Sequence, residues 1–337
     1  YRAIPVNSSS SLKDYSTDTR KYYKRHILKE KVKEKYNEAI LMGQIVETLL
    51  MEPDEFDNLF FLSSCADIPG GMMLDFVVSL VKHTMKATDI EGVVTVDFLD
   101  LAERAHEEAG YKLKLESVIK KFDGSDAEVY YKELCTVEYN KLKVVTPQNV
   151  NNATQIVNEL KDNPITSIVV NLKSGPTFEV INQMKISGFH IDGMPMKSML
   201  DKVIINHTHK TIQFYDLKCT WSVEKFYKDY YLYRRSYIQA FVYYKALQHL
   251  TEAEEKYAGY TVDLPKFIVC DSINYYSPLI YELDTEDLKD AYNGFEARGY
   301  KYQGVRDIIK NLHWAIDSNK WNISRENFQN NGLVKLK

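Results

Sequence analysis

The sequence predicts an α/β protein with a mixed central sheet that is flanked by helices and enlarged by a helical insertion. Two observations lead to this prediction. Helical patterns dominate the chain up to about residue 162, and short β-branched or alternating runs begin after Pro164. The chain has 337 residues, of which 45% are hydrophobic and 27% charged, so it can build a sizeable core and is not a disordered chain.

The first half is predicted to be mostly helical. Residues 1–15 are expected to form an extended arm with a serine cap, and residues 18–52 a long helix or a helix pair. Apolar residues recur at helical spacing in four stretches between residues 72 and 142. Residues 147–162 follow a threonine cap and begin with proline at the first helical position, so another helix is expected there.

Strands are expected in series after Pro164. The predicted strands are the runs ITSIVVNL, TFEVINQM, PMKSMLDKVII and TIQFYDLKC, followed by residues 266–271 and 277–283. Helices are predicted at about 222–232, 234–253, 285–297 and 302–317.

Composition limits the class of protein without identifying a partner. The net charge of -4 neither indicates nor excludes nucleic-acid binding, because local patches decide that. One such patch is the run from Arg20 to Lys35, which could be a solvated helix face or could follow a phosphate backbone. No apolar run is long enough to cross a membrane, no signal peptide is recognisable, and the four separated cysteines form no CxxC pair. We therefore expect a cytoplasmic protein with reduced thiols.

Three residues carry the clearest chemical pattern. Asp216 and Lys218 lie two apart in a predicted strand, so they share a face, and the polar link at 206–210 would pair that strand with the one that contains Asp201. Two carboxylates that meet at one place suit Mg²⁺, and a nearby lysine could orient or help deprotonate an attacking water. Such a triplet is also common by chance. However, two charges in an otherwise apolar strand would be costly without a role.

The following predicted helix adds Gln239 and Tyr243, which lie four apart on one face. Together, Asp201, the Asp216-x-Lys218 pair and the Gln-x-x-x-Tyr motif resemble the PD-(D/E)XK nuclease superfamily, in particular its RecB-like branch. The wider pattern is similar to the phage RecE (exonuclease VIII) type nuclease domain. That resemblance covers about 8–56 and 144–250 and includes the stretches SSSLKDYSTDTRKYYKRHIL, MGQIVETLLMEPDEF and VVTPQNVNNATQIVNELKDNP.

This resemblance implies a fold, an activity and roles for residues. The implied fold is a single restriction-endonuclease-like domain over 1–337, with a core from about 18–56 and 144–317 and a helical insertion at about 60–142. The implied activity is a metal-dependent DNA exonuclease that exposes a single strand for recombination or repair. The implied ligands of Mg²⁺ or Mn²⁺ are Asp201, Asp216, the carbonyl of Leu217, and Glu47, which stands where the branch usually has histidine. Lys218 would position the water, Gln239 would brace the site, and Tyr243 would contact the DNA backbone.

Other expectations concern secondary residues and partners. Glu179 falls where the family carries a glutamate on its first strand, and Tyr233, Arg234 and Arg235 either contact the substrate backbone or serve packing and solvation. The resemblance implies DNA, a single-strand annealing protein and further copies of the chain as partners. It implies no iron–sulfur cluster, because the tight C-terminal cysteine trio is missing. Two alternatives remain open: an inactive nuclease fold that binds DNA or assembles complexes, and a helical interaction protein whose triad is accidental.

Overall fold

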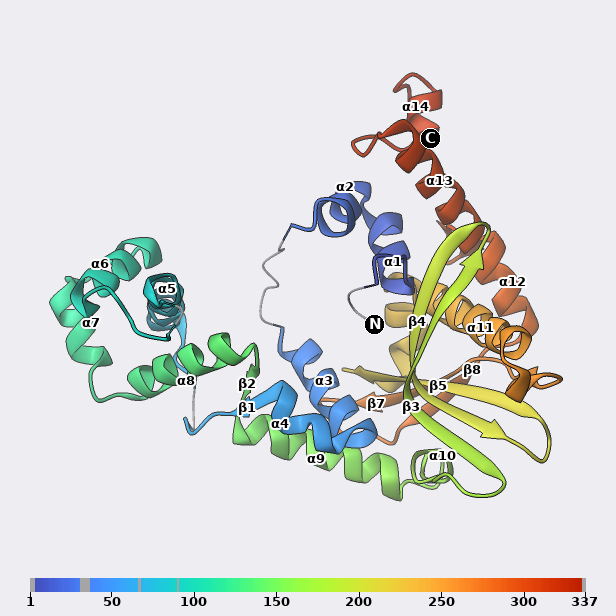
Figure 1. Ribbon diagram of the computed structural model, residues 1–337, viewed down its shortest axis with the longest axis horizontal. Helices are drawn as coiled ribbons and strands as arrows, with labels where there is room; N and C mark the ends of the chain where they lie inside the picture. The colour runs from blue at the N-terminus through green and yellow to red at the C-terminus, as the bar shows by residue number, and fades with distance from the viewer. Residues whose placement is uncertain (1–3, 31–36, 66–67, 90, 335–337) are drawn as a thin grey trace. The chain divides into compact units, whose positions relative to one another are not determined.

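The computed structural model describes residues 4–30, 37–65, 68–89 and 91–334 (Figure 1). The chain divides into two compact units. The first consists of Tyr1–Met51 and Ile156–Lys337, and the second of Glu52–Gln155. The segment expected as a helical insertion, 60–142, lies inside the second unit. None of the described helices is both long enough and apolar enough to span a membrane.

The first unit is built on a six-stranded sheet in the order β3-β4-β5-β7-β8, with β6 beside β5. The pairs β3–β4, β4–β5 and β7–β8 are antiparallel, whereas β5 runs parallel to β6 and β7. The predicted mixed sheet flanked by helices is therefore confirmed. The strands are β3 (Phe178–Ile191), β4 (Met194–Asn206), β5 (Thr211–Thr220), β6 (Thr261–Val262), β7 (Lys266–Asp271) and β8 (Leu279–Glu282).

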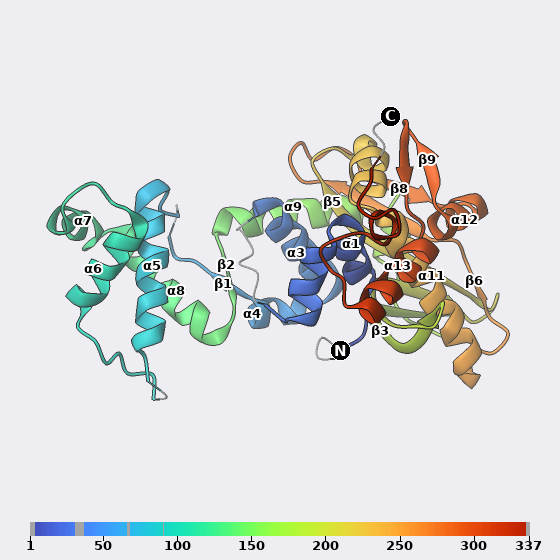
Figure 2. The ribbon, with the colours of Figure 1, turned by 90° about the horizontal axis from the view of Figure 1, so that it is seen from above.

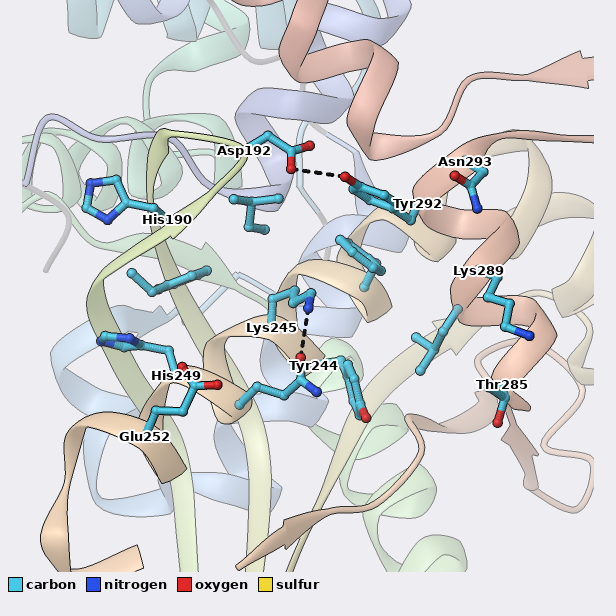
Figure 3. A pocket seen from close by; sticks show the side chains of 15 residues that line it. His190, Asp192, Tyr244, Lys245, His249, Glu252, Thr285, Lys289, Tyr292 and Asn293 are labelled. Carbon is cyan, nitrogen blue, oxygen red and sulfur yellow. Dashed lines mark hydrogen bonds between the residues drawn. The ribbon is translucent and has the colours of Figure 1, made fainter. Parts of the chain in front are cut away.

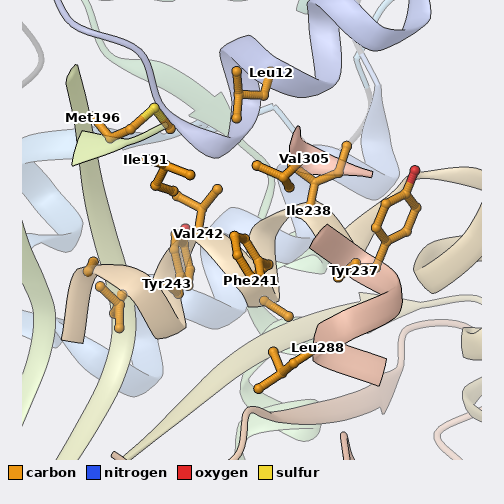
Figure 4. Close-up of a cluster of buried hydrophobic side chains, with 14 of the residues drawn as sticks. Leu12, Ile191, Met196, Tyr237, Ile238, Phe241, Val242, Tyr243, Leu288 and Val305 are labelled. Atoms are coloured by element: carbon orange, nitrogen blue, oxygen red, sulfur yellow. The ribbon is translucent and has the colours of Figure 1, made fainter. Parts of the chain in front are cut away.

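Helix α11 (Ser236–Ala253) packs against β3 and β4, and it is the centre of the hydrophobic core. Side chains from β4, α1 (Ser9–Thr17), α12 (Thr285–Asn293) and α13 (Val305–Ser318) close around it (Figure 4). The backbones of α1 and α12 lie beside α11 (Figure 2). Tyr237 and Val242 of α11 are fully buried in this cluster. A separate helix, α3 (Glu38–Met51), packs against β5 and β4.

The second unit has a helical core of its own. Four helices surround buried aromatic residues that include Phe76 and Phe122, and their edge-to-face contact helps to fix the packing. The helices are α5 (Gly71–Ala87), α6 (Phe98–Ala109), α7 (Leu115–Phe122) and α8 (Asp126–Asn140), and β1 (Phe60–Leu62) pairs in parallel with β2 (Lys143–Val145). The four predicted helices of this region are confirmed.

The remaining elements are short or connect the others. They are α2 (Thr19–Tyr22), η1 (Tyr23–Ile27), η2 (Pro53–Glu55), α4 (Phe56–Leu59), α9 (Pro147–Asp162), α10 (Ser167–Val170), η3 (Val223–Lys225), η4 (Tyr227–Tyr233), η5 (Glu255–Tyr257), β9 (Phe295–Ala297), β10 (Tyr300–Tyr302) and α14 (Arg325–Gln329). The helix predicted at 147–162 is confirmed.

Several local predictions are wrong. Residues 9–15 belong to α1 rather than to an extended arm, because Ser8 and Ser11 form a capping box that starts a helix. The run ITSIVVNL forms the helix α10 instead of a strand, since buried Thr166 bonds back to the carbonyl of Leu160 and holds the chain in turns. The helix predicted at 285–297 ends at Asn293, where Gly294 takes a positive φ of 87°.

Candidate active site

The two aspartates lie where strands β4 and β5 separate. Backbone pairing between these strands runs from Asn206↔Thr211 to Lys202↔Tyr215 and stops one pair short of Asp201 and Asp216. The predicted hairpin is thus confirmed, with residues 207–210 as its turn. The two carboxylates sit at the end of the ladder, on neighbouring strands and in the same register, as the sequence pattern indicated.

At this point the side chain of Asp201 bonds to the backbone of β5. Its Oδ2 accepts a hydrogen bond of 2.8 Å from the N–H of Leu217, and its side chain is buried. Burial, followed by the charges of Asp216 and Glu47, raises the pKa of Asp201 well above its ordinary value. A carboxyl group with this environment gains from a cation nearby, because a cation would favour its charged form.

Asp216 is the most buried carboxylate of the site, with 1% of its surface exposed. Its Oδ1 accepts a hydrogen bond of 2.8 Å from Nε2 of Gln239, which also donates to the hydroxyl of Tyr243 at 3.0 Å. The Lys218 ammonium forms an ion pair with its Oδ2. The predicted Gln-x-x-x-Tyr pair on α11 therefore holds one side of Asp216.

The Lys218 ammonium lies between oxygens that the sequence assigned to a metal. Besides Asp216 it approaches the carbonyl of Leu217 at 3.4 Å. Burial opposes its charge, but Asp216, Asp201 and Glu47 outweigh burial and raise the pKa of Lys218 above its ordinary value. Lys218 is therefore a hydrogen-bond donor at neutral pH, suited to orient a water or a phosphate oxygen rather than to accept a proton.

Glu47 reaches the same place from α3. A Cβ on Gly43, one turn earlier, would lie 3.7 Å from the Cβ of Cys219, which measures how closely α3 approaches β5. Gln183 of β3 donates a hydrogen bond of 2.6 Å to Oε1 of Glu47. Because the charge of Glu47 acts on both Asp201 and Lys218, the three predicted carboxylates share one electrostatic environment.

Sequence reasoning missed Lys13 of α1. Its ammonium donates a hydrogen bond of 2.9 Å to Oε1 of Gln239, so the Gln239 amide links Lys13 to Asp216. Burial, followed by the charges of Lys218 and Arg234, lowers the pKa of Lys13 to about 7. The signal in the sequence was a lysine inside the pattern SSSLKDY, but it is informative only once that segment is known to be a helix.

The remaining predicted residues are divided. Arg234 is exposed, and its guanidinium lies 4.5 Å from the centre of the Tyr230 ring. Its charge contributes to the lowered pKa of Lys13, so Arg234 borders the site. Tyr233 is 82% exposed, and Arg235 immediately precedes α11 with a left-handed backbone conformation. Of the basic run from Arg20 to Lys35, residues 31–35 lie outside the described residues.

The structure does not place Glu179 with the two aspartates. This residue pairs with Ile205 in the β3–β4 ladder, near the turn that joins β4 to β5, and its carboxylate binds Lys256 at 2.8 Å and Tyr257 at 3.3 Å. These partners make it part of a surface ion-pair cluster.

The donor set at the strand separation fits a hard divalent cation. Within the described residues, no group of three or more histidine, cysteine, aspartate or glutamate side chains forms a metal centre by itself. Mg²⁺ does not need one, since it commonly binds one or two carboxylates and completes its shell with waters and substrate phosphate. Asp201, Asp216 and the carbonyl of Leu217 would hold such an ion, and Glu47 would act on it from α3.

A cavity lies away from the two aspartates. It has a volume of about 570 Å³ and is lined by α11, α12 and the end of β3 (Figure 3). Its α11 residues, such as Tyr244 and Gln248, stand on the face opposite Gln239 and Tyr243. Tyr292 donates to Asp192 and Lys245 donates to Gln248 there, so these polar groups already have partners.

No family model matches this sequence, and no curated protein matches it at a significant level. Among the solved structures that match is a crystal structure of a candidate exonuclease from Eubacterium rectale. It is 12% identical, the match covers 98% of this chain and 89% of that chain, and the TM-score is 0.46. A similarity this low carries no argument about function, which must be argued from the site.

Proposed function

We propose that the protein is a metal-dependent deoxyribonuclease with a PD-(D/E)XK-like core, acting as an exonuclease of the RecE type. One observation carries the proposal: Asp201, Asp216, the Leu217 carbonyl and the Lys218 ammonium converge where β4 and β5 separate. Buried charges of this kind are costly to keep without a function.

Each residue has a role in phosphodiester hydrolysis. Asp201 and Asp216 would hold Mg²⁺ or Mn²⁺, which when bound supplies positive charge to the scissile phosphate and activates water. Lys218, charged at neutral pH, would orient the attacking water or a phosphate oxygen. Gln239 fixes Oδ1 of Asp216, so the other carboxylate oxygen keeps its direction toward Lys218 and would be available to hold the ion.

Lys13 and Arg234 lie beyond Lys218, and the lowered pKa of Lys13, about 7, leaves this lysine partly protonated at neutral pH. With Lys218 and Arg234 charged, this side of the site would suit a polyanionic strand. The alternative, an inactive nuclease fold that binds DNA, shares this surface. It differs only in cleavage.

The test is Mg²⁺-dependent release of nucleotides from linear duplex DNA. Asp216→Asn keeps the shape of the side chain and removes a formal charge from the ion's surroundings, so cleavage should fall by roughly 10³-fold or more. DNA binding should persist, because the surrounding cations remain. Wild-type protein that binds DNA without cleaving it at any Mg²⁺ or Mn²⁺ concentration would favour the inactive alternative.

A further inference from the structure

Trp221 directly follows β5 and combines exposure with a fixed position. Its side chain is 45% exposed. Its indole N–H donates to Oδ2 of Asp229 at 3.2 Å, and the Lys225 ammonium lies 4.1 Å from the centre of the ring. Because these two contacts already hold the indole, it loses little freedom when a flat partner stacks on its exposed surface.

The segment that holds Trp221 also borders the candidate active site. The Tyr230 hydroxyl of η4 donates to the carbonyl of Cys219 at 3.2 Å, so η4 is bonded to β5 between Lys218 and Trp221. Burial raises the pKa of Tyr230, and the nearby charges of Arg234 and Lys218 oppose that rise. Three residues of extended chain, roughly 10 Å, separate Trp221 from Lys218. A strand held at the site can therefore reach the indole.

A second loop adds exposed apolar side chains at the same end of the sheet. Asp271 of β7 is buried opposite Thr220 in the parallel ladder, and its Oδ1 accepts a hydrogen bond of 2.8 Å from the N–H of Ile273. The N–H of Ser272 donates to the carbonyl of Thr220 at 2.7 Å, which ties this loop to the end of β5. Ile273 is 63% exposed and Tyr276 is 64% exposed. Large apolar side chains that gather in this way are typical of a binding surface.

The chemistry of this surface favours a flat, anionic partner. The indole offers a stacking face, and Lys225 and Arg234 bring positive charge to its surroundings. The carboxylate of Asp229 is negative, but one of its oxygens accepts the indole hydrogen bond. Nucleobases stack on aromatic side chains and carry phosphates beside them. A base inside a duplex has both faces covered by its neighbours, so only a base that has left the stack can lie on the indole.

We propose that Trp221 is a stacking platform for a base of an unpaired DNA strand next to the site of hydrolysis. This inference rests on the proposed function and adds the form of the substrate, which is unpaired where it passes the end of β5. Trp221 contacts no reacting atom in this arrangement. Its loss should therefore reduce affinity more than it reduces the rate of cleavage at saturating DNA.

The test separates stacking on bases from contacts with phosphates. Trp221→Leu removes the aromatic ring and keeps an apolar side chain, and Trp221→Phe keeps a smaller ring. Tyr300→Leu is the matched control, since it removes an aromatic ring that is 69% exposed on β10. Affinity is measured in an Asp216→Asn background for a single-stranded oligonucleotide and for an abasic strand of the same length, which keeps the phosphates and lacks the bases.

Trp221→Leu should weaken binding of the base-bearing strand about tenfold, Trp221→Phe about threefold, and Tyr300→Leu less than about twofold. On the abasic strand, the Asp216→Asn protein and its Trp221→Leu variant should bind equally. Tryptophan fluorescence gives a second readout, because Trp314 is half-buried and Trp321 is buried. The base-bearing strand should quench this fluorescence, and Trp221→Leu should lose most of the quenching.

The inference is overturned if Trp221→Leu binds the base-bearing strand as tightly as Tyr300→Leu does. It is also overturned if the protein with Trp221 intact binds the base-bearing and abasic strands equally. If wild type still cleaves DNA in either case, the nuclease proposal stands and only the stacking assignment fails. A wild-type protein that neither binds nor cleaves DNA would overturn both.

Discussion

Glu47 is the residue at which this chain departs from the family that it resembles. Its carboxylate receives a hydrogen bond from Gln183 and raises the pKa of both Asp201 and Lys218. If Glu47 served a bound ion, its carboxylate would be a harder ligand than an imidazole and would suit Mg²⁺ better than softer ions.

We predict that Glu47→Gln raises the Mg²⁺ concentration needed for half-maximal cleavage by about tenfold or more. The thermal unfolding midpoint should stay nearly unchanged. Glu47→His should keep part of the activity and shift the preference from Mg²⁺ toward Mn²⁺, because imidazole is a softer ligand. Metal titrations of cleavage measure both effects. Full activity of Glu47→Ala at low Mg²⁺ would make Glu47 an ordinary helix residue.

At the scale of elements, the first two helices meet around one carboxylate. Asp14 of α1 binds Lys21 at 2.6 Å and Arg25 at 3.2 Å, and it also contacts His26 at 3.1 Å, so it joins α1 to α2 and η1. This corner carries Lys13, and its stability decides whether that lysine is in place beside Gln239.

Burial of Asp14 opposes ionisation, but hydrogen bonds from His26 and Lys21 outweigh burial and lower the pKa of Asp14 to about 2. A lowered carboxyl pKa stabilises the fold above the unfolded value of 3.8, and this stability is lost as the pH falls toward 2. We expect Asp14→Asn to reduce the free energy of unfolding by about 1–2 kcal/mol at pH 7.

Chemical denaturation of both proteins between pH 7 and pH 2 checks this expectation. The gap between wild type and Asp14→Asn should narrow below about pH 4. A gap that is constant over the whole range would mean that the ion pairs of Asp14 contribute nothing to stability.

Some elements of the site could be predicted from the sequence. The alternation around Asp216 and Lys218 predicted the strand and the shared face, because two charges in an apolar strand are costly unless they meet at a polar site. The Gln239–Tyr243 spacing likewise predicted that both residues lie on one helix face, and they form a hydrogen bond there.

Other features depended on tertiary structure and could not be predicted. Residues 9–15 show no strong helical periodicity, so the sequence does not predict α1, nor the place of Lys13 on it. Glu179 was placed correctly in a strand, but which end of that strand lies near Asp201 follows from the β3–β4 register.

For the whole molecule, the net charge of -4 means that the overall field does not attract DNA. Binding must come from local cations near the site, and Arg234 with Arg235 is the described pair that precedes α11. Replacing both by glutamine should flatten the dependence of DNA affinity on salt by up to about one log-log unit per lost phosphate contact.

Lys120→Gln with Lys121→Gln is the matched control for this pair. Both lysines are exposed at the end of α7, and either double variant changes the net charge from -4 to -6. The control should leave the salt slope unchanged. Equal slopes for both double variants would show that neither arginine contacts phosphate.

The central claim is that the site formed by Asp201, Asp216 and Lys218 hydrolyses DNA. The most direct measurement compares Mg²⁺-dependent nucleotide release from linear duplex DNA by wild type, Asp216→Asn and Asp317→Asn, the last a control at an exposed position of α13. The account predicts that wild type and Asp317→Asn cleave DNA and that removing the metal abolishes this cleavage. Asp216→Asn should cleave roughly 10³-fold or more slowly while it still binds DNA. Cleavage by Asp216→Asn at the wild-type rate, or cleavage that persists without any divalent metal, would contradict it.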